Sequence, residues 1–217
     1  MAPEVLARLI DAAAAAIDAD ADHLTSLDRA IGDGDHGINM KRGFGAVHEI
    51  RDELAGLPLP GALQKIGMTL VMKVGGASGP LYGSFFMAMG KAIPNPLEDP
   101  KDIAAAFAEG VAAVKRRGRS DAGEKTMLEV LVPVAEALRA GAREGAAPAA
   151  LLARVREAAE RGVESTRDMR ATKGRASYLG ERSIGHIDPG ARSSQLLVHS
   201  VCDVAAAALP TGEARRA

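Results

Sequence analysis

Residues 4–22 read EVLARLIDAAAAAIDADAD, and this stretch is typical of an amphipathic helix. Apolar side chains recur at helical spacing in its first half, and alanine, the residue with the highest helix propensity, fills its centre. Alanine and leucine with interspersed charges continue along much of the chain. No run of Val, Ile, Thr and Tyr alternates with polar residues as it would in a surface strand. The sequence therefore predicts an all-α protein.

Helical periodicity can be followed through several ranges, which are separated by glycine and proline residues that break helices. The ranges are 4–22, 38–55, 60–74, 79–91, 100–117, 123–141, 148–171 and 190–209. Because the connections are short, we expect antiparallel neighbours in a single-domain barrel or bundle of about eight helices. This domain is expected to cover residues 1–210, and the Ala/Arg-rich tail 211–217 is predicted to be disordered.

Composition and charge restrict the class of protein. The chain has 217 residues, of which 47 % are apolar, and this suffices for one domain with a core. A formal net charge of −1 gives no global positive field that would attract nucleic acid or an anionic membrane. The N-terminus lacks the basic region of a signal peptide, and no stretch approaches the roughly 20 apolar residues of a membrane span. The single cysteine, Cys202, is expected to pack as a small hydrophobe in a reducing, cytoplasmic compartment.

The segment 27–39, LDRAIGDGDHGIN, places three aspartates and three glycines in one stretch that is predicted to be too kinked for a helix. Asp28, Asp33 and Asp35 would repel one another without a cation between them, and their hard oxygen atoms suit Mg²⁺ or Ca²⁺. Flexible glycines allow a turn tight enough to aim three side chains at one point. Since Mg²⁺ keeps positions open for substrate phosphates, a nucleotide is the natural second ligand. A solvated turn whose Asp and Asn side chains cap the adjoining helices explains the same residues equally well.

Two familiar binding motifs do not fit this segment. Its GxGxxG spacing matches the dinucleotide fingerprint, but no strand precedes it, and the spacer positions hold Asp33, Asp35 and His36, which would repel a bare pyrophosphate. An EF-hand that begins at Asp33 would require Gly and Glu where the chain has Ile38 and Phe44. His36 itself could bind a metal, contact a phosphate or ribose, or be held by backbone hydrogen bonds, and we favour a phosphate contact.

Two further segments carry candidate contacts for a phosphate. Residues 74–83, VGGASGPLYG, form a glycine-rich turn that runs into a helix, where backbone N–H groups and the helix dipole favour an anion. The same glycines could instead let two helices pack closely. The irregular segment 172–192 carries arginines that could clamp phosphate oxygens. Its Asp188 and Pro189 also suit the N-cap and first position of a helix.

Three smaller features each allow two interpretations. Asn39 suits an N-cap and a ligand contact equally well. The basic run 115–119, KRRGR, is typical of a solvated helix C-terminus, with Gly118 as the left-handed residue that ends the helix. Met127 could fill the core or cover the face of an adenine.

Four blocks of the sequence, taken in order, resemble the nucleotide-binding L subunit of dihydroxyacetone kinases. They are the acidic segment 27–39, GGASGPLYG at 75–83, GEKTML at 123–128 and TKGRASYLGERS at 172–183. The resemblance spans nearly the whole chain and implies an α-helical barrel of eight helices that holds ADP or ATP and two magnesium ions at one end. Glu124 and Glu129 stand where Asp is more frequent in the family, a departure that leaves the metal site intact.

The resemblance also implies roles for single residues. It gives the metal ligands as Asp28, Asp33 and Asp35, and the catalytic arginine that contacts the nucleotide as Arg175. The other nucleotide contacts that it implies are His36, Gly37, Ile38, Asn39, Ala77, Ser78, Gly118, Met127, Asp188, Pro189 and Gly190.

The family resemblance implies partner proteins as well. A separate K subunit carries dihydroxyacetone, and in one branch a phosphotransferase-system protein, the M subunit, rephosphorylates ADP that stays bound to L. In the other branch the L portion is usually fused to K and uses free ATP. A free-standing L chain resembles the first branch. A homodimer is expected, and a regulatory module that presents its ADP state to a transcription factor, or a kinase for another small ketose, are the alternatives.

Overall fold

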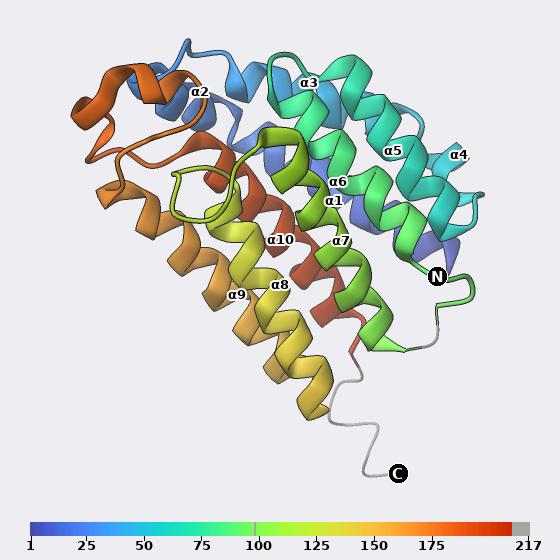
Figure 1. Ribbon diagram of the computed structural model, residues 1–217. Helices are drawn as coiled ribbons and strands as arrows, with labels where there is room; N and C mark the ends of the chain where they lie inside the picture. Colours follow the sequence, from blue (N-terminus) through green and yellow to red (C-terminus); the bar gives the residue numbers. More distant parts are fainter. Residues whose placement is uncertain (98, 210–217) are drawn as a thin grey trace.

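The computed structural model describes residues 1–97 and 99–209, and within these ranges all regular secondary structure is helical and there is no strand (Figure 1). The α-helices are α1 (Pro3–Ala19), α2 (Ala21–Ile31), α3 (His36–Glu49), α4 (Arg51–Ala55), α5 (Leu59–Lys73), α6 (Ser78–Ala92), α7 (Pro100–Gly118), α8 (Leu128–Glu144), α9 (Pro148–Ser165) and α10 (Pro189–Ala207). Two 3₁₀-helices follow α9: η1 (Thr166–Asp168) and η2 (Arg175–Ser183). The all-α prediction is confirmed, and the predicted tail 211–217 lies outside the described residues. No described helix combines the length and the apolar character needed to cross a membrane.

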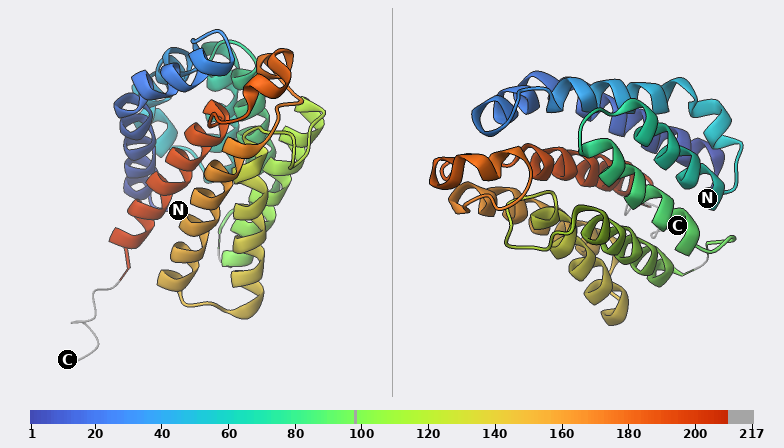
Figure 2. Two further views of the ribbon diagram at one scale, coloured as in Figure 1. Left: turned by 90° about the vertical axis from the view of Figure 1, so that its left-hand side faces the viewer. Right: turned by 45° about the horizontal axis from the view of Figure 1, so that its top comes forward.

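Eight of the helices form a closed ring. In order around the ring, each in contact with the next, they are α1, α3, α5, α6, α7, α8, α9 and α10, and α10 packs against α1 again. Figure 2 shows the barrel-like arrangement from two further sides. Two clusters of buried apolar side chains fill the space between the helices, and Ile17, Met40, Leu70 and Leu128 are at most 1 % exposed. Cys202 is 2 % exposed and packs in one of these clusters, as predicted.

The acidic segment is more helical than the sequence indicates. We predicted that residues 27–39 are too kinked for a helix, and this is wrong, because α2 continues to Ile31 and α3 already begins at His36. Leu24 and Ile31 are buried two turns apart on one face of α2, and this burial stabilises the helix up to the first glycine. Only residues 32–35 lie outside helices.

Gly37 allows α3 to pack directly on α2. A Cβ atom at position 37 would lie 1.9 Å from the carbonyl oxygen of Ala21 and 2.5 Å from Oγ1 of Thr25. A second difference concerns the end of α7, where the left-handed residue is Arg119, with φ of 47°, and not Gly118, which remains helical. The basic end of α7 is thus closed by a residue other than the expected glycine.

Candidate nucleotide and metal site

The loops at one end of the barrel surround a cavity of about 550 Å³. Its walls come from the connections α2–α3, α5–α6 and α7–α8 and from the long segment between α9 and α10, which carries η2. In Figure 1 these connections lie toward the upper left of the molecule, at one end of the ring of helices. Segments that are far apart in the sequence therefore meet at one place.

All but two of the predicted site residues line this cavity. They are Asp28, Asp33, Asp35, His36, Asn39, Ala77, Ser78, Gly118, Met127, Arg175, Asp188, Pro189 and Gly190. The first exception, Gly37, is buried against α2, and the second, Ile38, points outward with 59 % of its surface exposed. The fold thus brings together the three predicted aspartates, the glycine-rich turn, the predicted arginine and residues 188–190.

The three aspartates form a group that suits a divalent cation. One carboxylate oxygen of each of Asp28, Asp33 and Asp35 lies within 4.8 Å of the others. Asp28 comes from the last turn of α2, whereas Asp33 and Asp35 are exposed in the turn before α3. Oxygen ligands at such mutual distances match the preference of Mg²⁺, and two of the three face solvent, where a phosphate could complete the coordination.

Asp28 also caps α3. Its Oδ2 atom accepts hydrogen bonds from the backbone N–H groups of Asp35, at 2.8 Å, and His36, at 3.1 Å. A Cβ atom at Gly32 would lie 2.2 Å from Oδ1 of Asp28, so glycine at this position leaves the room that the carboxylate occupies. Capping and metal binding, which the sequence left as alternatives, are therefore compatible at this residue.

Arg175 reaches the aspartates from the other side of the cavity. Its Nη2 atom lies 2.9 Å from Oδ2 of Asp33, and 69 % of its side chain is exposed. An exposed ion pair of this kind contributes little to stability, so the guanidinium can exchange its carboxylate partner for a phosphate at small cost.

His36 is held by hydroxyl groups on both sides of its ring. Nδ1 lies 3.2 Å from Oγ of Ser78, and Nε2 lies 2.9 Å from Oγ of Ser193, which in turn lies 2.8 Å from the hydroxyl of Tyr82. Burial lowers the pKa of His36, although Asp28 opposes this effect, so the ring is neutral at pH 7. In this arrangement both nitrogens are engaged, and His36 orients Ser78 at the start of α6.

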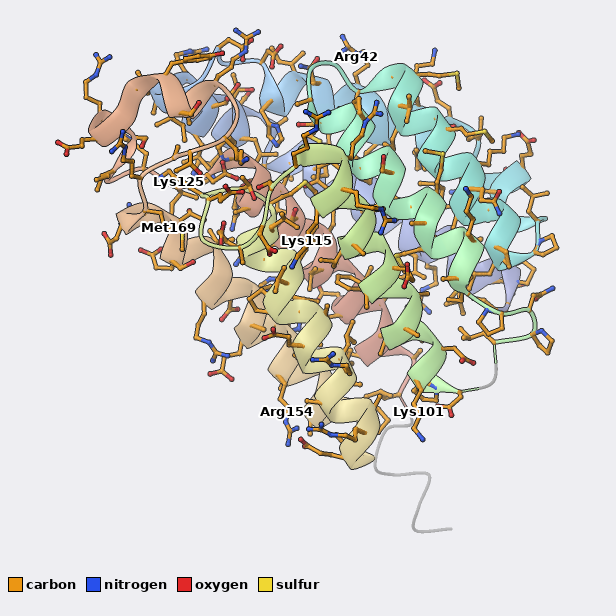
Figure 3. The ribbon with its side chains drawn as sticks, viewed as in Figure 1. Arg42, Lys101, Lys115, Lys125, Arg154 and Met169 are labelled. Atoms are coloured by element: carbon orange, nitrogen blue, oxygen red, sulfur yellow. The ribbon has the colours of Figure 1, made fainter. Side chains whose placement is uncertain are left out.

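Asn39 forms part of the support of the glycine-rich turn. Its Oδ1 atom accepts a hydrogen bond of 2.7 Å from Nη2 of Arg42, which is labelled in Figure 3. The Nε atom of Arg42 donates to the carbonyl oxygen of Lys73. A Cβ atom at Gly75 would lie 2.5 Å from the same Oδ1 atom. The turn can approach α3 this closely only because Gly75 has no side chain.

Asp188 and Lys125 are two ionisable residues that line the cavity. Asp188 caps α10 by accepting a hydrogen bond of 2.7 Å from the N–H group of Ala191, as the sequence predicted. Burial raises the pKa of Asp188 to about 7, although the Ala191 amide and the Lys125 ammonium act to lower it. Lys125 is 1 % exposed, and burial lowers its pKa as well. A carboxyl group with such a raised pKa in a cavity is typical of functional sites.

Several cavity residues were not predicted individually as contacts, although they lie in segments that were quoted from the sequence. They are Tyr82, Arg117, Lys125 and Lys173. Lys125 stands within the block GEKTML, which we quoted only for its resemblance, and a lysine between polar neighbours is ordinarily a surface residue. A lone sequence contains no signal that would place this side chain in the interior.

Comparisons with known proteins identify the family of the chain. The family described as the DAK2 domain matches residues 30–203. The chain is 48 % identical over 178 residues to PEP-dependent dihydroxyacetone kinase 1, ADP-binding subunit DhaL, of Listeria innocua. The aligned region covers 82 % of this chain and 84 % of that relative. The chain is 43 % identical over 180 residues to the corresponding ADP-binding subunit DhaL of Escherichia coli, which covers 82 % of this chain and 86 % of that one.

Solved structures show the same fold. The dihydroxyacetone kinase from C. freundii in complex with AMP-PNP and Mg²⁺ matches with a TM-score of 0.72 at 24 % sequence identity, over 92 % of this chain. The chain spans only 34 % of that longer protein. At this identity the likeness concerns the fold alone, whereas the family model matches residues 30–203, which include most of the residues that line the cavity. The chain therefore belongs to the DAK2-domain family.

Proposed function

We propose that the chain is the ADP-binding subunit of a PEP-dependent dihydroxyacetone kinase, and that its cavity holds the nucleotide together with magnesium. The observation that carries the proposal is the convergence of Asp28, Asp33 and Asp35 with Arg175 and the start of α6 around one cavity. A nucleoside diphosphate needs this combination, because cationic and N–H groups must compensate its negative charge. Curated relatives that are 43–48 % identical carry that function in their names.

The residues of the cavity divide into two groups. Asp28, Asp33 and Asp35 would hold the cation, which we propose as two Mg²⁺ ions, and bound Mg²⁺ supplies charge neutralisation at the phosphates. Arg175 and the backbone N–H groups of the turn that contains Ala77 would bind the phosphate oxygens. The other predicted contacts, Ile38 and Gly118 among them, remain proposals for the surroundings of the nucleotide.

To phosphoryl transfer, this chain would contribute mainly the positioning of the phosphoryl group and its electrostatic stabilisation. Arg175 is exposed at the mouth of the cavity, where it would steady the charge that spreads over the transferred group. Both ring nitrogens of His36 are bonded to serine hydroxyls, so we propose that it fixes Ser78 at the start of α6. The acceptor hydroxyl and the groups that activate it would belong to a partner subunit.

We propose three kinds of partner. A K subunit would present dihydroxyacetone at the open end of the cavity, and the M subunit of the phosphotransferase system would regenerate the phosphorylated nucleotide while it stays bound. A transcriptional regulator and a second copy of the chain, as a homodimer, are further proposed partners. We also propose that the reaction takes place in the cytoplasm, a reducing compartment that suits the free, buried Cys202.

Calorimetry on protein stripped of nucleotide tests the binding site. ADP in Mg²⁺ buffer should bind the native chain, and Asp35→Asn should weaken binding about tenfold or more, because it removes one charged ligand of the cation. Asp22→Asn, at an exposed position of α2, is the matched control and should bind like the native chain. Equal ADP affinity for the native chain and Asp35→Asn, or no effect of EDTA, would contradict the proposed site.

Reconstitution separates the alternatives for the activity. The chain is mixed with a K subunit and dihydroxyacetone, and the phosphoryl donor is either PEP with the phosphotransferase-system proteins or free ATP. Turnover with the first donor supports the proposal, whereas turnover with ATP alone indicates an ATP-dependent kinase. ADP binding without turnover from any donor indicates the regulatory module.

A further inference from the structure

The segment between α9 and α10 is a long excursion whose two ends lie side by side. The N–H group of Gly185 donates to the carbonyl oxygen of Arg167 at 2.7 Å, and the N–H group of Asp188 donates to Oγ1 of Thr166 at 3.0 Å. Between these ends the chain travels through η2, which carries Arg175 to Asp33 on the far wall of the cavity. The position of Arg175 therefore depends on how firmly the base of this excursion is closed.

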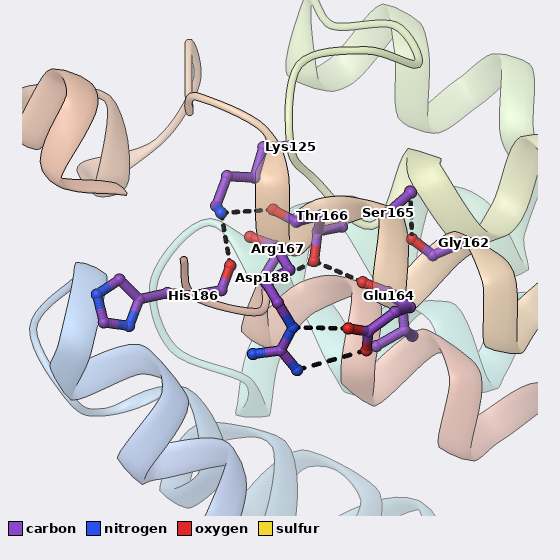
Figure 4. A network of polar contacts seen from close by, with 9 residues as sticks. Lys125, Gly162, Glu164, Ser165, Thr166, Arg167, His186 and Asp188 are labelled. Atoms are coloured by element: carbon purple, nitrogen blue, oxygen red, sulfur yellow. Dashed lines mark hydrogen bonds and ion pairs between the residues drawn. The ribbon is translucent and has the colours of Figure 1, made fainter. Parts of the chain in front are cut away.

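Lys125 bridges the same two ends from a third element, the turn before α8. Its Nζ atom donates to the carbonyl oxygen of Thr166 and to that of His186, both at 2.6 Å (Figure 4). The side chain of Lys125 is 1 % exposed, and its backbone has a φ of 60°, which a non-glycine residue adopts rarely. A buried ammonium is costly unless its donors are satisfied, and here two of the three are bonded to main-chain carbonyls.

From these contacts we infer that Lys125 is a positioning residue, which clamps the base of the segment 166–188 and thereby places Arg175 over the aspartates. A merely apolar side chain could fill the same space, but it would remove the ammonium donor from both carbonyl oxygens and leave that of Thr166 with only the 3.3 Å hydrogen bond from the N–H group of Met169. Thr166 is 0 % exposed, so no solvent molecule at the surface of the folded chain takes over that role. The clamp acts on Arg175 through the backbone and does not require contact between Lys125 and a ligand.

Trypsin provides a direct test, because the clamped segment contains exposed cleavage sites at Arg175 and Arg182. We expect Lys125→Met, which keeps the length and apolar volume of the side chain, to be cleaved within this segment about tenfold faster or more under native conditions. Lys125→Arg, which keeps the charge and the donors, should restore part of the protection. Lys101→Met, at the opposite end of the barrel (Figure 3), is the matched control and should be cleaved like the native chain.

A second measurement separates positioning from general stability. The consequence for phosphoryl transfer rests on the function proposed above: Lys125→Met should transfer about thirtyfold more slowly, while its affinity for Mg-ADP stays within about threefold of the native value. If Lys125 closed the base of the segment without positioning Arg175, Lys125→Met would change the rate of proteolysis but leave the transfer rate at saturating nucleotide unchanged. If the native chain itself shows no phosphoryl transfer, the proteolysis result still tests whether Lys125 closes the base of the segment.

Two outcomes would overturn the inference. Equal cleavage of Lys125→Met and the native chain would show that the base of the segment is closed without the ammonium. A loss of protection spread evenly over the whole chain would show that Lys125 supports the fold as a whole. Should Lys125→Met fail to fold, Lys125→Gln retains one side-chain amide donor group and is expected to show intermediate cleavage at Arg175, and cleavage equal to the native chain would again refute the clamp.

Discussion

The carboxyl group of Asp188 makes the stability of the ligand-free chain depend on pH in a direction opposite to that of most aspartates. Burial raises its pKa from the ordinary 3.8 to about 7. Between these values the unfolded chain has lost the proton while the folded chain still holds it, so the free energy of unfolding falls as pH rises. The stabilisation is complete below pH 3.8 and has disappeared once the pH exceeds about 7.

The size of this effect on the free energy of unfolding follows from the interval between the two pKa values. At about 1.4 kcal/mol for each pH unit, the difference between 3.8 and about 7 corresponds to about 4 kcal/mol, of which about 3 kcal/mol falls between pH 4.5 and pH 7. Asp188→Asn removes the titration but keeps a side-chain oxygen that can cap α10 through the Ala191 amide. Relative to the native chain, the variant should therefore gain about 3 kcal/mol over this range.

Urea unfolding of both proteins in EDTA, at intervals of half a pH unit, measures this difference. Titrations of groups that do not interact with Asp188 cancel when the two free energies of unfolding are subtracted. Asp121→Asn is the control, because the pKa shift of Asp121 has the opposite sign. The Lys115 ammonium lowers the pKa of Asp121, so the contribution of this carboxylate to stability is lost only below pH 3.8. A difference between native chain and Asp188→Asn that stays constant from pH 4.5 to pH 8 would refute the reasoning, since it would mean that Asp188 is already ionised in the folded state.

Three further predictions concern packing and hydrogen bonds near the site. Gly37→Ala should lower the free energy of unfolding by about 2–4 kcal/mol, because its Cβ atom would lie 1.9 Å from the Ala21 oxygen, and an unchanged urea midpoint would contradict the close packing of α2 and α3. Gly45→Ala, in the same helix but with no atom within 4 Å of its Cβ, should raise it by about 0.5–1 kcal/mol in the same assay. Tyr82→Phe should cost about 1–2 kcal/mol, because the hydroxyl bonded to Ser193 is lost, and a neutral effect would indicate that the buried serines find other partners.

The helical ring was predictable because its signal is local. Alanine-rich and leucine-rich periodicity marks each helix within a window of a few turns, and proline and glycine mark the breaks. The boundary errors arose where tertiary contacts decide. Gly37 looks like a loop residue in the sequence, yet it is glycine because α3 must approach Ala21, and only the packed helices reveal this.

The distinction between local sequence signals and tertiary contacts also applies to the site. Asp28, Asp33 and Asp35 are near neighbours in the sequence, so their charge alone predicts that they act together, and the structure brings one oxygen of each within 4.8 Å. Lys125 meets partners that are 41 and 61 residues away, and no spacing rule connects it with Thr166 or His186. Contacts of this range depend on the topology of the whole ring.

The double hydrogen bond to Oδ2 of Asp28 has a consequence for ion selectivity. Two main-chain amides fix this carboxylate before any ligand arrives, so its orientation is preorganised and not imposed by the incoming ion. A chelating corner that cannot expand accommodates a small ion with short bonds better than a larger one that requires six to eight oxygens. For the proposed cation site at Asp28, Asp33 and Asp35, we therefore expect tighter binding of Mg²⁺ than of Ca²⁺.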